Sequence, residues 1–170
     1  ARRAVGVPGA AGVMDAETRT LFESRLLSLA KARAREGRLP EATHTGAVKN
    51  PFCGDEIAVD VKLSAQGAVV DLGYEAKACS LCVASAELLS DWIDQVYSQA
   101  QSQEGGSPAP LQPEDLHALA QAIDDVLKGG NAPVRDGSEA LVSVAPFRAR
   151  HKCVTLPFDA AIKALEDKQT

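Results

Sequence analysis

The segment NPFCGD, residues 50–55, joins two groups that can act on a metal or on sulfur. Asn, Pro and Gly are typical of a tight turn, and this turn contains Cys53, with Asp55 two positions later. A thiolate is both a soft metal ligand and a nucleophile toward sulfur, whereas a carboxylate offers a harder oxygen ligand. The pair therefore predicts either a metal site or a site of thiol chemistry.

Three further cysteines extend this set: Cys79 and Cys82, spaced as Cys-x-x-Cys, and Cys153. Without Cys82, the set comprises three thiolates and one carboxylate, which suits tetrahedral zinc or an iron-sulfur cluster. The spacing alone does not prove a metal site, because the first pair is Cys-x-Asp and the other cysteines lie far apart in sequence.

Hydrophobic periodicity predicts the elements that must position these residues. Helices are expected at 15–37, closing on Gly37, at 82–101, at 114–130 and at 154–169 with Pro157 in its first turn, and strands at 44–50, 56–64 and 68–78. A short helix within 138–151 should break at Pro146, and 102–113 is interpreted as a flexible link. The order predicts an α+β fold, in which several helices pack against one face of a small antiparallel sheet of two to three strands.

Three of the four cysteines fall at the ends of these elements. Cys53 lies in the turn before a strand, Cys79 at the junction of a strand and a helix, and Cys153 just before the last helix. Helix N-termini lower the pKa of a thiol, so the last two positions are expected to favour the thiolate. Packing as a small apolar residue is the competing interpretation, and it fits Cys82, one turn into its helix, as well as a chemical role does.

Composition limits the classes of function. A length of 170 residues with 45% hydrophobic content favours one globular domain, expected at 14–170. Residues 1–13 are expected to be a disordered tail or a cloning remnant, with native translation starting at Met14. A formal net charge of -5 argues against nucleic-acid binding, and no apolar run approaches the ~20 residues of a membrane-spanning helix. A cytoplasmic protein with reduced thiols is expected.

Three blocks of the sequence resemble, in order, the signature blocks of the IscU/NifU/SufU-type iron-sulfur cluster assembly scaffold family. These blocks are NPFCGDEIAVDVKL, ACSLCVASAELLSDW and RHKCVTLPFDAAIKAL. That family carries an Asn-Pro-x-Cys-Gly-Asp block, a Gly-Cys-x-x-x-x-Ala-Ser block and a cysteine that opens the last helix. The resemblance covers roughly residues 15–168 and implies the same α+β fold.

Further details resemble the SufU-like branch of the family. The step from Cys79 to Cys153 is long, and residues 102–130 occupy the place of the insertion that distinguishes SufU-like proteins. The RHKC sequence also resembles the Arg-x-Lys-Cys of that branch. IscU-type proteins offer a Leu-Pro-Pro-Val-Lys segment to a dedicated chaperone, but residues 144–148 read VAPFR, so dependence on that chaperone is not expected.

The resemblance implies a metal site with four ligands: Cys53, Asp55, Cys79 and Cys153. The bound species would be a zinc ion or a transient iron-sulfur cluster held by the three cysteines. A SufS-like cysteine desulfurase would donate persulfide sulfur, and downstream cluster assembly or carrier proteins would receive it. Exchange chemistry favours Cys53, on its glycine-flanked loop, as the persulfide acceptor, with Cys153 as the alternative.

Four further residues are candidates for auxiliary roles: Cys82, Arg150, His151 and Lys152. Cys82 replaces a serine of SufU-like proteins and shares a helix face with Cys79, so relay of a persulfide, a disulfide, ligand replacement and simple packing all stay open. His151 is either an extra ligand or proton donor, or a surface side chain. Arg150 and Lys152 would offset the net charge of about −2 that three thiolates, a carboxylate and a divalent ion leave.

Two functions remain at this point. One is a zinc-binding sulfur acceptor or cluster scaffold, and it is open whether this counts as an enzyme. The other is a zinc-stabilised interaction module without sulfur chemistry. Asp55 favours the first, because purely structural zinc sites prefer cysteine and histidine ligands.

Overall fold

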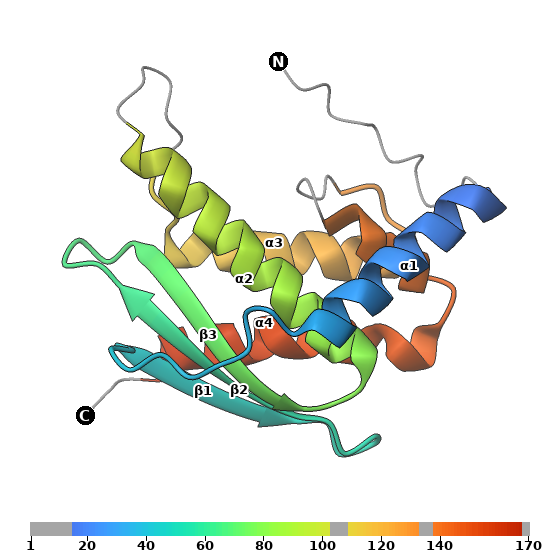
Figure 1. Cartoon of the computed structure of the whole chain (residues 1–170), viewed down its shortest axis with the longest axis horizontal. Helices are drawn as coiled ribbons and strands as arrows, with labels where there is room; N and C mark the ends of the chain where they lie inside the picture. The colour runs from blue at the N-terminus through green and yellow to red at the C-terminus, as the bar shows by residue number, and fades with distance from the viewer. Residues whose placement is uncertain (1–14, 103–108, 133–137, 168–170) are drawn as a thin grey trace.

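The computed structural model describes residues 15–102, 109–132 and 138–167, and it shows a three-stranded antiparallel sheet with helices on one face (Figure 1). The elements in chain order are α1 (Ala16–Ala32), β1 (His44–Lys49), β2 (Glu56–Leu63), β3 (Val69–Lys77), α2 (Ser80–Gln101), α3 (Pro113–Leu127), the 3-10 helices η1 (Ser138–Val144) and η2 (Arg148–Arg150), and α4 (His151–Glu166). The predicted α+β fold is confirmed. The tail expected at 1–13 lies outside the described residues.

Alternation of side chains gives the sheet one apolar face. In the order β1-β2-β3, Gly46 pairs with Val59 and Val59 with Tyr74, and Val59 and Tyr74 are fully buried. Helix α4 packs on β1 and β2, and α2 packs on β3, so both helices cover this face. The core therefore lies between the sheet and these two helices, with α1 and α3 packed on their outer sides.

Helix α4 approaches β1 most tightly at Gly46. A Cβ atom at this position would lie 2.6 Å from the backbone nitrogen of Ala164, closer than real Cβ contacts. The absence of a side chain therefore lets the helix rest on the strand backbone. This contact sets the height of α4 above the sheet.

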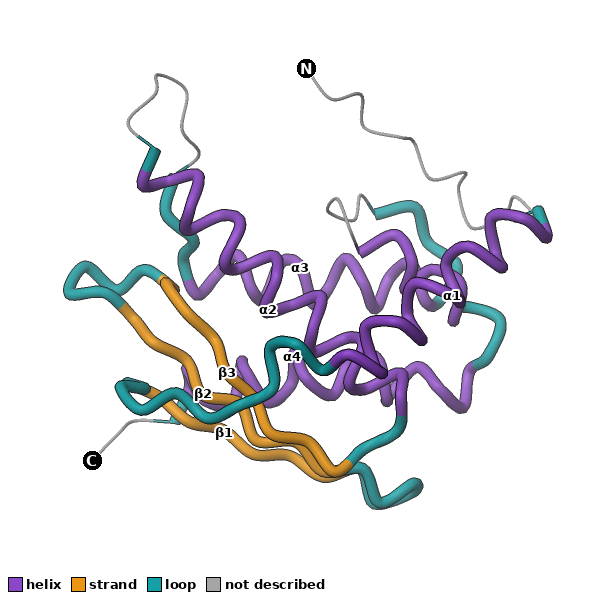
Figure 2. Tube along the Cα trace, in the orientation of Figure 1, coloured by secondary structure: helices purple, strands orange, loops and turns teal. Residues whose placement is uncertain are grey.

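The segment between α1 and β1 wraps around the free edge of β3 and crosses the outer face of the sheet (Figure 2). Gly37 N–H donates to the Tyr74 carbonyl at 2.7 Å. The Arg38 guanidinium then donates to both carboxylate oxygens of buried Asp60, at 2.7 and 2.8 Å. The segment therefore covers an edge that would otherwise be open to pairing.

Several expected helix boundaries are wrong, since α2 begins at Ser80 rather than at 82 and α3 ends at Leu127 rather than at 130. The first helix ends at Ala32 rather than Gly37, with Arg33 in the left-handed region at φ 45°. The cause is tertiary, because the Arg35 N–H donates to the Glu87 carboxylate on α2 at 3.0 Å and pulls this segment away from the helix axis. Buried Glu87 also accepts from the Tyr74 hydroxyl at 2.6 Å.

The last helix begins at His151 rather than at 154, so Pro157 lies inside it and not in the first turn. Proline lacks an N–H and cannot donate to the carbonyl four residues earlier, which belongs to Cys153. The short helix expected to break at Pro146 is instead two 3-10 helices, one on each side of it. None of the described helices has the length and apolar character to cross a bilayer.

Candidate functional site

The NPFCGD segment is the loop of the β1–β2 hairpin. Asn50 organises it: its N–H donates to the Asp55 carbonyl at 2.8 Å, its carbonyl accepts from Gly54 N–H at 2.8 Å, and its side chain accepts from Phe52 N–H at 3.0 Å. Gly54 takes a positive φ of 78°, which suits glycine. The loop thus exposes Cys53 at its tip and turns Asp55 inward.

Three of the four predicted ligands come together in one group. One ligand atom each from Cys53, Asp55 and Cys153 lies within 4.8 Å of the others. Zinc–sulfur bonds of about 2.3 Å place any two ligand atoms of one ion less than about 5 Å apart. A single ion therefore fits between these three side chains.

Cys79, the fourth predicted ligand, is joined to this group by hydrogen bonds. Its backbone N–H donates to Asp55 Oδ1 at 3.1 Å, and its side chain is hydrogen-bonded to Cys153. Cys79 is the N-cap residue of α2, and among the described residues its thiol makes no capping hydrogen bond. The thiol is therefore adjacent to the group and not committed to the helix.

Asp55 shows most clearly that the group suits a cation. Its Oδ2 atom is buried, and within the described ranges it has no hydrogen-bond partner. A buried carboxylate oxygen without a partner is costly, and a bound metal ion would satisfy it. Three thiols and one carboxylate fit a tetrahedral zinc ion.

Two helix N-termini point at the group, because Cys79 caps α2 and Cys153 is the third residue of α4. The sequence predicted that a place at the N-terminus of the last helix would favour the thiolate of Cys153. Burial instead raises the pKa of Cys153 to about 12, and the hydrogen bond to Cys79 adds to the rise. Burial outweighs the helix dipole here, so metal binding must displace the thiol proton.

Cys82 lies one helical turn after Cys79 and is 0% exposed. Burial raises the pKa of its thiol far above the usual value, and the nearby Cys79 contributes to the rise. Cys82 is not part of the compact three-residue group. Its position is inside the core, directly beside the site.

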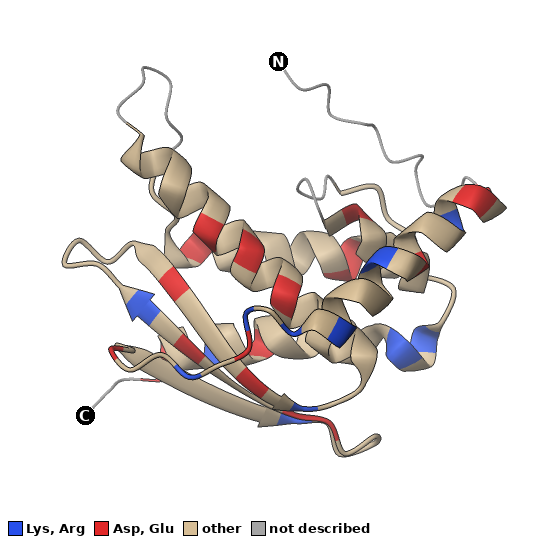
Figure 3. Ribbon diagram, in the orientation of Figure 1, with Lys and Arg blue, Asp and Glu red and all other residues tan. Residues whose placement is uncertain are grey.

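The predicted auxiliary residues on α4 have other partners. Lys152 forms an ion pair with Asp159, and His151 Nε2 lies 2.8 Å from the Ala145 carbonyl oxygen. Both line a groove with Arg148, and that groove contains no cysteine. Arg150 is exposed. Its predicted role, to offset the negative charge of the ligands, stays a prediction. Figure 3 shows basic residues gathered at the turn before α4.

Exposed apolar side chains lie close to the cysteines, and the sequence analysis missed them. Phe52, next to Cys53, is 95% exposed. A groove of about 260 Å³ includes Ser80, the residue after Cys79, and is lined by Glu23, Leu26, Leu27, Ser80, Leu81, Ser143, Val144 and Phe147. A single exposed aromatic residue looks like a core residue in sequence, and its position in a turn is the only available signal.

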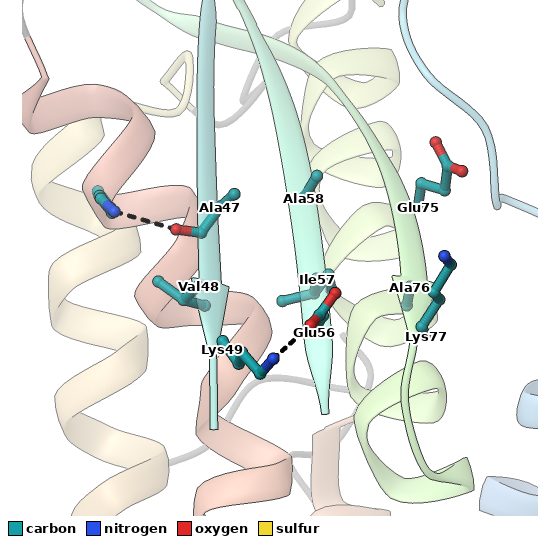
Figure 4. Close-up of a pocket in the computed structure, with 10 residues that line it drawn as sticks. Ala47, Val48, Lys49, Glu56, Ile57, Ala58, Glu75, Ala76 and Lys77 are labelled. Carbon is teal, nitrogen blue, oxygen red and sulfur yellow. Dashed lines mark hydrogen bonds and ion pairs between the residues drawn. The ribbon is translucent and has the colours of Figure 1, made fainter. Parts of the chain in front are cut away.

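A third groove, of about 640 Å³, lies on the outer face of the sheet (Figure 4). Its lining includes the ion pair between Lys49 and Glu56, at 2.8 Å, and the exposed side chains of Glu75 and Lys77. It contains no cysteine, so its size does not mark it as the reactive site.

Comparison with known proteins agrees with this geometry. The family model described as NifU-like N terminal domain matches residues 23–102. The chain is 27% identical to the iron-sulfur cluster assembly scaffold protein IscU of Streptococcus pyogenes, over 70% of this chain and 67% of that protein. It is 26% identical to the zinc-dependent sulfurtransferase SufU of Bacillus subtilis, over 91% of this chain and 96% of that protein.

A crystal structure of a NifU-like protein (N-terminal) from Brucella abortus superimposes with a TM-score of 0.68 at 25% identity. The match covers 87% of this chain and 94% of that one. The nearly full-length match to SufU also agrees with the expected SufU-like branch. Residues 23–102 therefore carry a NifU-like N-terminal domain, and the relatives that match most of the chain are iron-sulfur cluster assembly proteins of the IscU and SufU types.

Proposed function

We propose that this chain binds zinc, or a nascent iron-sulfur cluster as its cargo, and accepts persulfide sulfur from a cysteine desulfurase. The observation that carries the proposal is the meeting of exposed Cys53 with buried Asp55 and Cys153 within 4.8 Å. Such a group offers both a metal site and one thiol that a partner protein can reach. The zinc dependence named for the SufU relative supports zinc as the bound ion.

Cys53 is the proposed acceptor because it is the exposed thiol of the group. Its thiolate attacks the terminal sulfur of the partner's persulfide. A new sulfur–sulfur bond forms on Cys53, the old bond to the partner's cysteine breaks, and that cysteine leaves as a thiolate. Cys153 is buried, so it serves as an acceptor only for sulfur already inside the site.

Cys79, Asp55 and Cys153 would hold the metal together with Cys53. A bound zinc ion keeps its ligand thiols deprotonated at neutral pH. Asp55 is the ligand that distinguishes this site from a structural one, since a carboxylate is a harder and weaker ligand for zinc than a thiolate. The hydrogen bond from Cys79 N–H holds Asp55 Oδ1 and leaves Oδ2 for the ion.

The apolar surface around the cysteines supports docking of a partner protein. Exposed Phe52 precedes Cys53 in the chain, and exposed Phe147 lines the groove that includes Ser80, the residue after Cys79. A desulfurase that reaches Cys53 would cover these side chains. Downstream cluster assembly or carrier proteins are the proposed recipients of the sulfur.

The test is alanine formation by a cysteine desulfurase with and without the chain, combined with intact-mass analysis. We expect faster turnover, because removal of the persulfide frees the desulfurase for its next cycle, and we expect added sulfur on the chain. Cys53→Ser should abolish both effects while remaining folded. If the wild type neither speeds turnover nor gains sulfur, the chain is a zinc-stabilised interaction module.

A further inference from the structure

Cys79 and Cys82 occupy the N-cap and the third position of α2. Cys79 is partly accessible, whereas Cys82 is completely buried. A reachable thiol at a helix N-terminus, with a second thiol one turn inside, is the arrangement in which Cys-x-x-Cys pairs exchange disulfides. The surrounding fold differs from that of thiol-disulfide enzymes, but the local geometry depends only on the helix.

The two thiols can bridge with a small movement. Side chains three residues apart on a helix have Cβ atoms about 5–6 Å apart, and a disulfide needs about 3.5–4.5 Å. Cys79 can move toward Cys82, because its backbone is extended, with φ −67° and ψ 164°, and lies outside the regular helix. Cys82 is fixed in the core and need not move.

Cys82 also differs from the other cysteines in being outside the proposed ligand set. Sulfur can reach its neighbour Cys79 through Cys153, which lies within 4.8 Å of Cys53 and is hydrogen-bonded to Cys79. In each transfer the incoming thiolate attacks the terminal sulfur and the previous carrier leaves as a thiolate. A persulfide on Cys79 would then stand beside a thiol that solvent cannot reach.

We propose that Cys82 is a resolving thiol that converts a persulfide on Cys79 into sulfide. Cys82 sulfur attacks the inner sulfur of the persulfide, a Cys79–Cys82 disulfide forms, and hydrosulfide leaves with the thiol proton of Cys82. The transferred sulfur gains two electrons and becomes sulfide, and the two cysteines lose them. An external dithiol then reduces the disulfide for the next cycle.

This inference rests on the proposed function, because sulfur must first enter the site. The inference adds an activity to the proposed function, because the chain would release sulfide, with electrons from its own two thiols. Sulfide is the form of sulfur in an iron-sulfur cluster. The burial of Cys82 gives the reaction its selectivity. Only a persulfide on the neighbouring residue can be attacked, whereas sulfur carried by other proteins cannot.

The experiment is a single turnover without added reductant. Reduced, anaerobic protein is loaded with inorganic polysulfide, desalted, and assayed for sulfide release and for disulfides by peptide mapping. The wild type should release about one sulfide per chain and acquire a Cys79–Cys82 disulfide. Cys82→Ser should release about tenfold less and keep the added sulfur as a persulfide. Cys82→Ala should behave in the same way.

Equal sulfide release from wild type and both variants, or a disulfide that joins Cys79 to Cys153 instead, would overturn the proposal. A parallel arm loads the protein with a desulfurase and cysteine. If that arm adds no sulfur but polysulfide-loaded wild type still releases sulfide with a Cys79–Cys82 disulfide, the proposed function fails and the reaction of Cys82 stands.

Discussion

At the scale of single residues, Asp55 has the most informative surroundings. One carboxylate oxygen accepts the Cys79 N–H at 3.1 Å, and the other is buried with no partner in the described parts of the chain. The first contact orients the carboxylate, and the second oxygen remains for a cation. Because oxygen is the weakest of the four proposed donors toward zinc, Asp55 is the ligand that can leave most easily.

Asp55→Ala should therefore hold its metal longer than the wild type. The remaining three thiols still bind the ion, water or another ligand takes the fourth position, and exchange at the carboxylate is lost. Sulfur transfer should weaken, because ligand exchange frees the acceptor thiol. Competition with a chelator, run beside a sulfur-transfer assay, measures both effects, and exposed Asp71→Ala is the control. Faster metal loss with normal transfer would show that Asp55 has no gating role.

The sequence predicted the identity of the site residues better than their surroundings. The turn motif and the helix starts placed Cys53, Asp55 and Cys153 at the ends of elements, but only the resemblance to the scaffold family joined them in one predicted ligand set. The contact of His151 with the Ala145 carbonyl could not be predicted, because it depends on how the chain turns between the two 3-10 helices before α4. The pKa of Cys153 was expected to fall, since sequence shows a helix N-terminus but not the burial that outweighs it.

At the scale of elements, the site depends on the height of α4 above the sheet. Cys153 is on the first turn of α4, and Gly46 lets that helix rest on β1. The hairpin that follows β1 carries Cys53 and Asp55. The contact at Gly46 therefore couples the two halves of the site.

Gly46→Ala should destabilise the fold by about 1–3 kcal/mol, because the new methyl group would overlap the α4 backbone. Metal affinity should fall with it, since a displaced α4 moves Cys153 away from the hairpin. Urea unfolding and metal titration measure the two quantities. Ala47→Val, on the exposed side of the same strand, should change neither. A Gly46→Ala protein with unchanged stability would show that α4 and β1 are not in close contact.

The buried carboxylate of Asp60 holds the segment between α1 and β1 on the outer face of the sheet. Burial alone raises the pKa of Asp60, but hydrogen bonds from Arg38, Thr45 and Leu39 N–H outweigh it, so the pKa lies below the usual value. A carboxyl whose pKa is lower in the folded state stabilises the fold at a pH above its unfolded-state pKa, near 4. This stabilisation is lost as the pH falls through the folded-state pKa.

Asp60→Asn should therefore cost about 1.5–3 kcal/mol at neutral pH, as expected for hydrogen bonds to a buried charge. The difference from the wild type should shrink as the pH falls below about 4, because the wild-type carboxylate is protonated first in the unfolded state and then, below its lowered pKa, in the folded state. Unfolding free energies at several pH values measure this. The surface pair of Glu41 and Lys62 is a control, and Glu41→Gln should change the unfolding free energy far less than Asp60→Asn does, because both charges of this pair are solvated. A pH-independent cost for Asp60→Asn would contradict the account.

The boundaries of elements were predicted where the cause is local. Strands β2 and β3 followed from alternation, and α2 from Leu88, Trp92 and Val96 at steps of four, all buried. The end of α1 was missed because a contact with Glu87, more than fifty residues away, decides it. Sequence periodicity contains no information about such a contact.

At the scale of the whole molecule, a bound metal would join the β1–β2 hairpin to the starts of α2 and α4. Zinc at about 1,000 times its Kd should add about 4 kcal/mol to the unfolding free energy. For a chain of this size that corresponds to a rise in Tm of about 10 °C. A chelator should reverse the rise. Cys53→Ser should lose most of the response, and an equal response in that variant would mean that zinc binds elsewhere.

The most direct test of the ligand set is X-ray absorption spectroscopy of the zinc-loaded protein, because it counts the sulfur and oxygen neighbours of the ion. We expect three sulfur neighbours at about 2.3 Å and one lighter neighbour at about 2.0 Å. The same spectrum is expected for Cys82→Ser. Four sulfur neighbours in the wild type, with one lost in Cys82→Ser, would show that Cys82 binds the metal in place of Asp55 and would contradict the account.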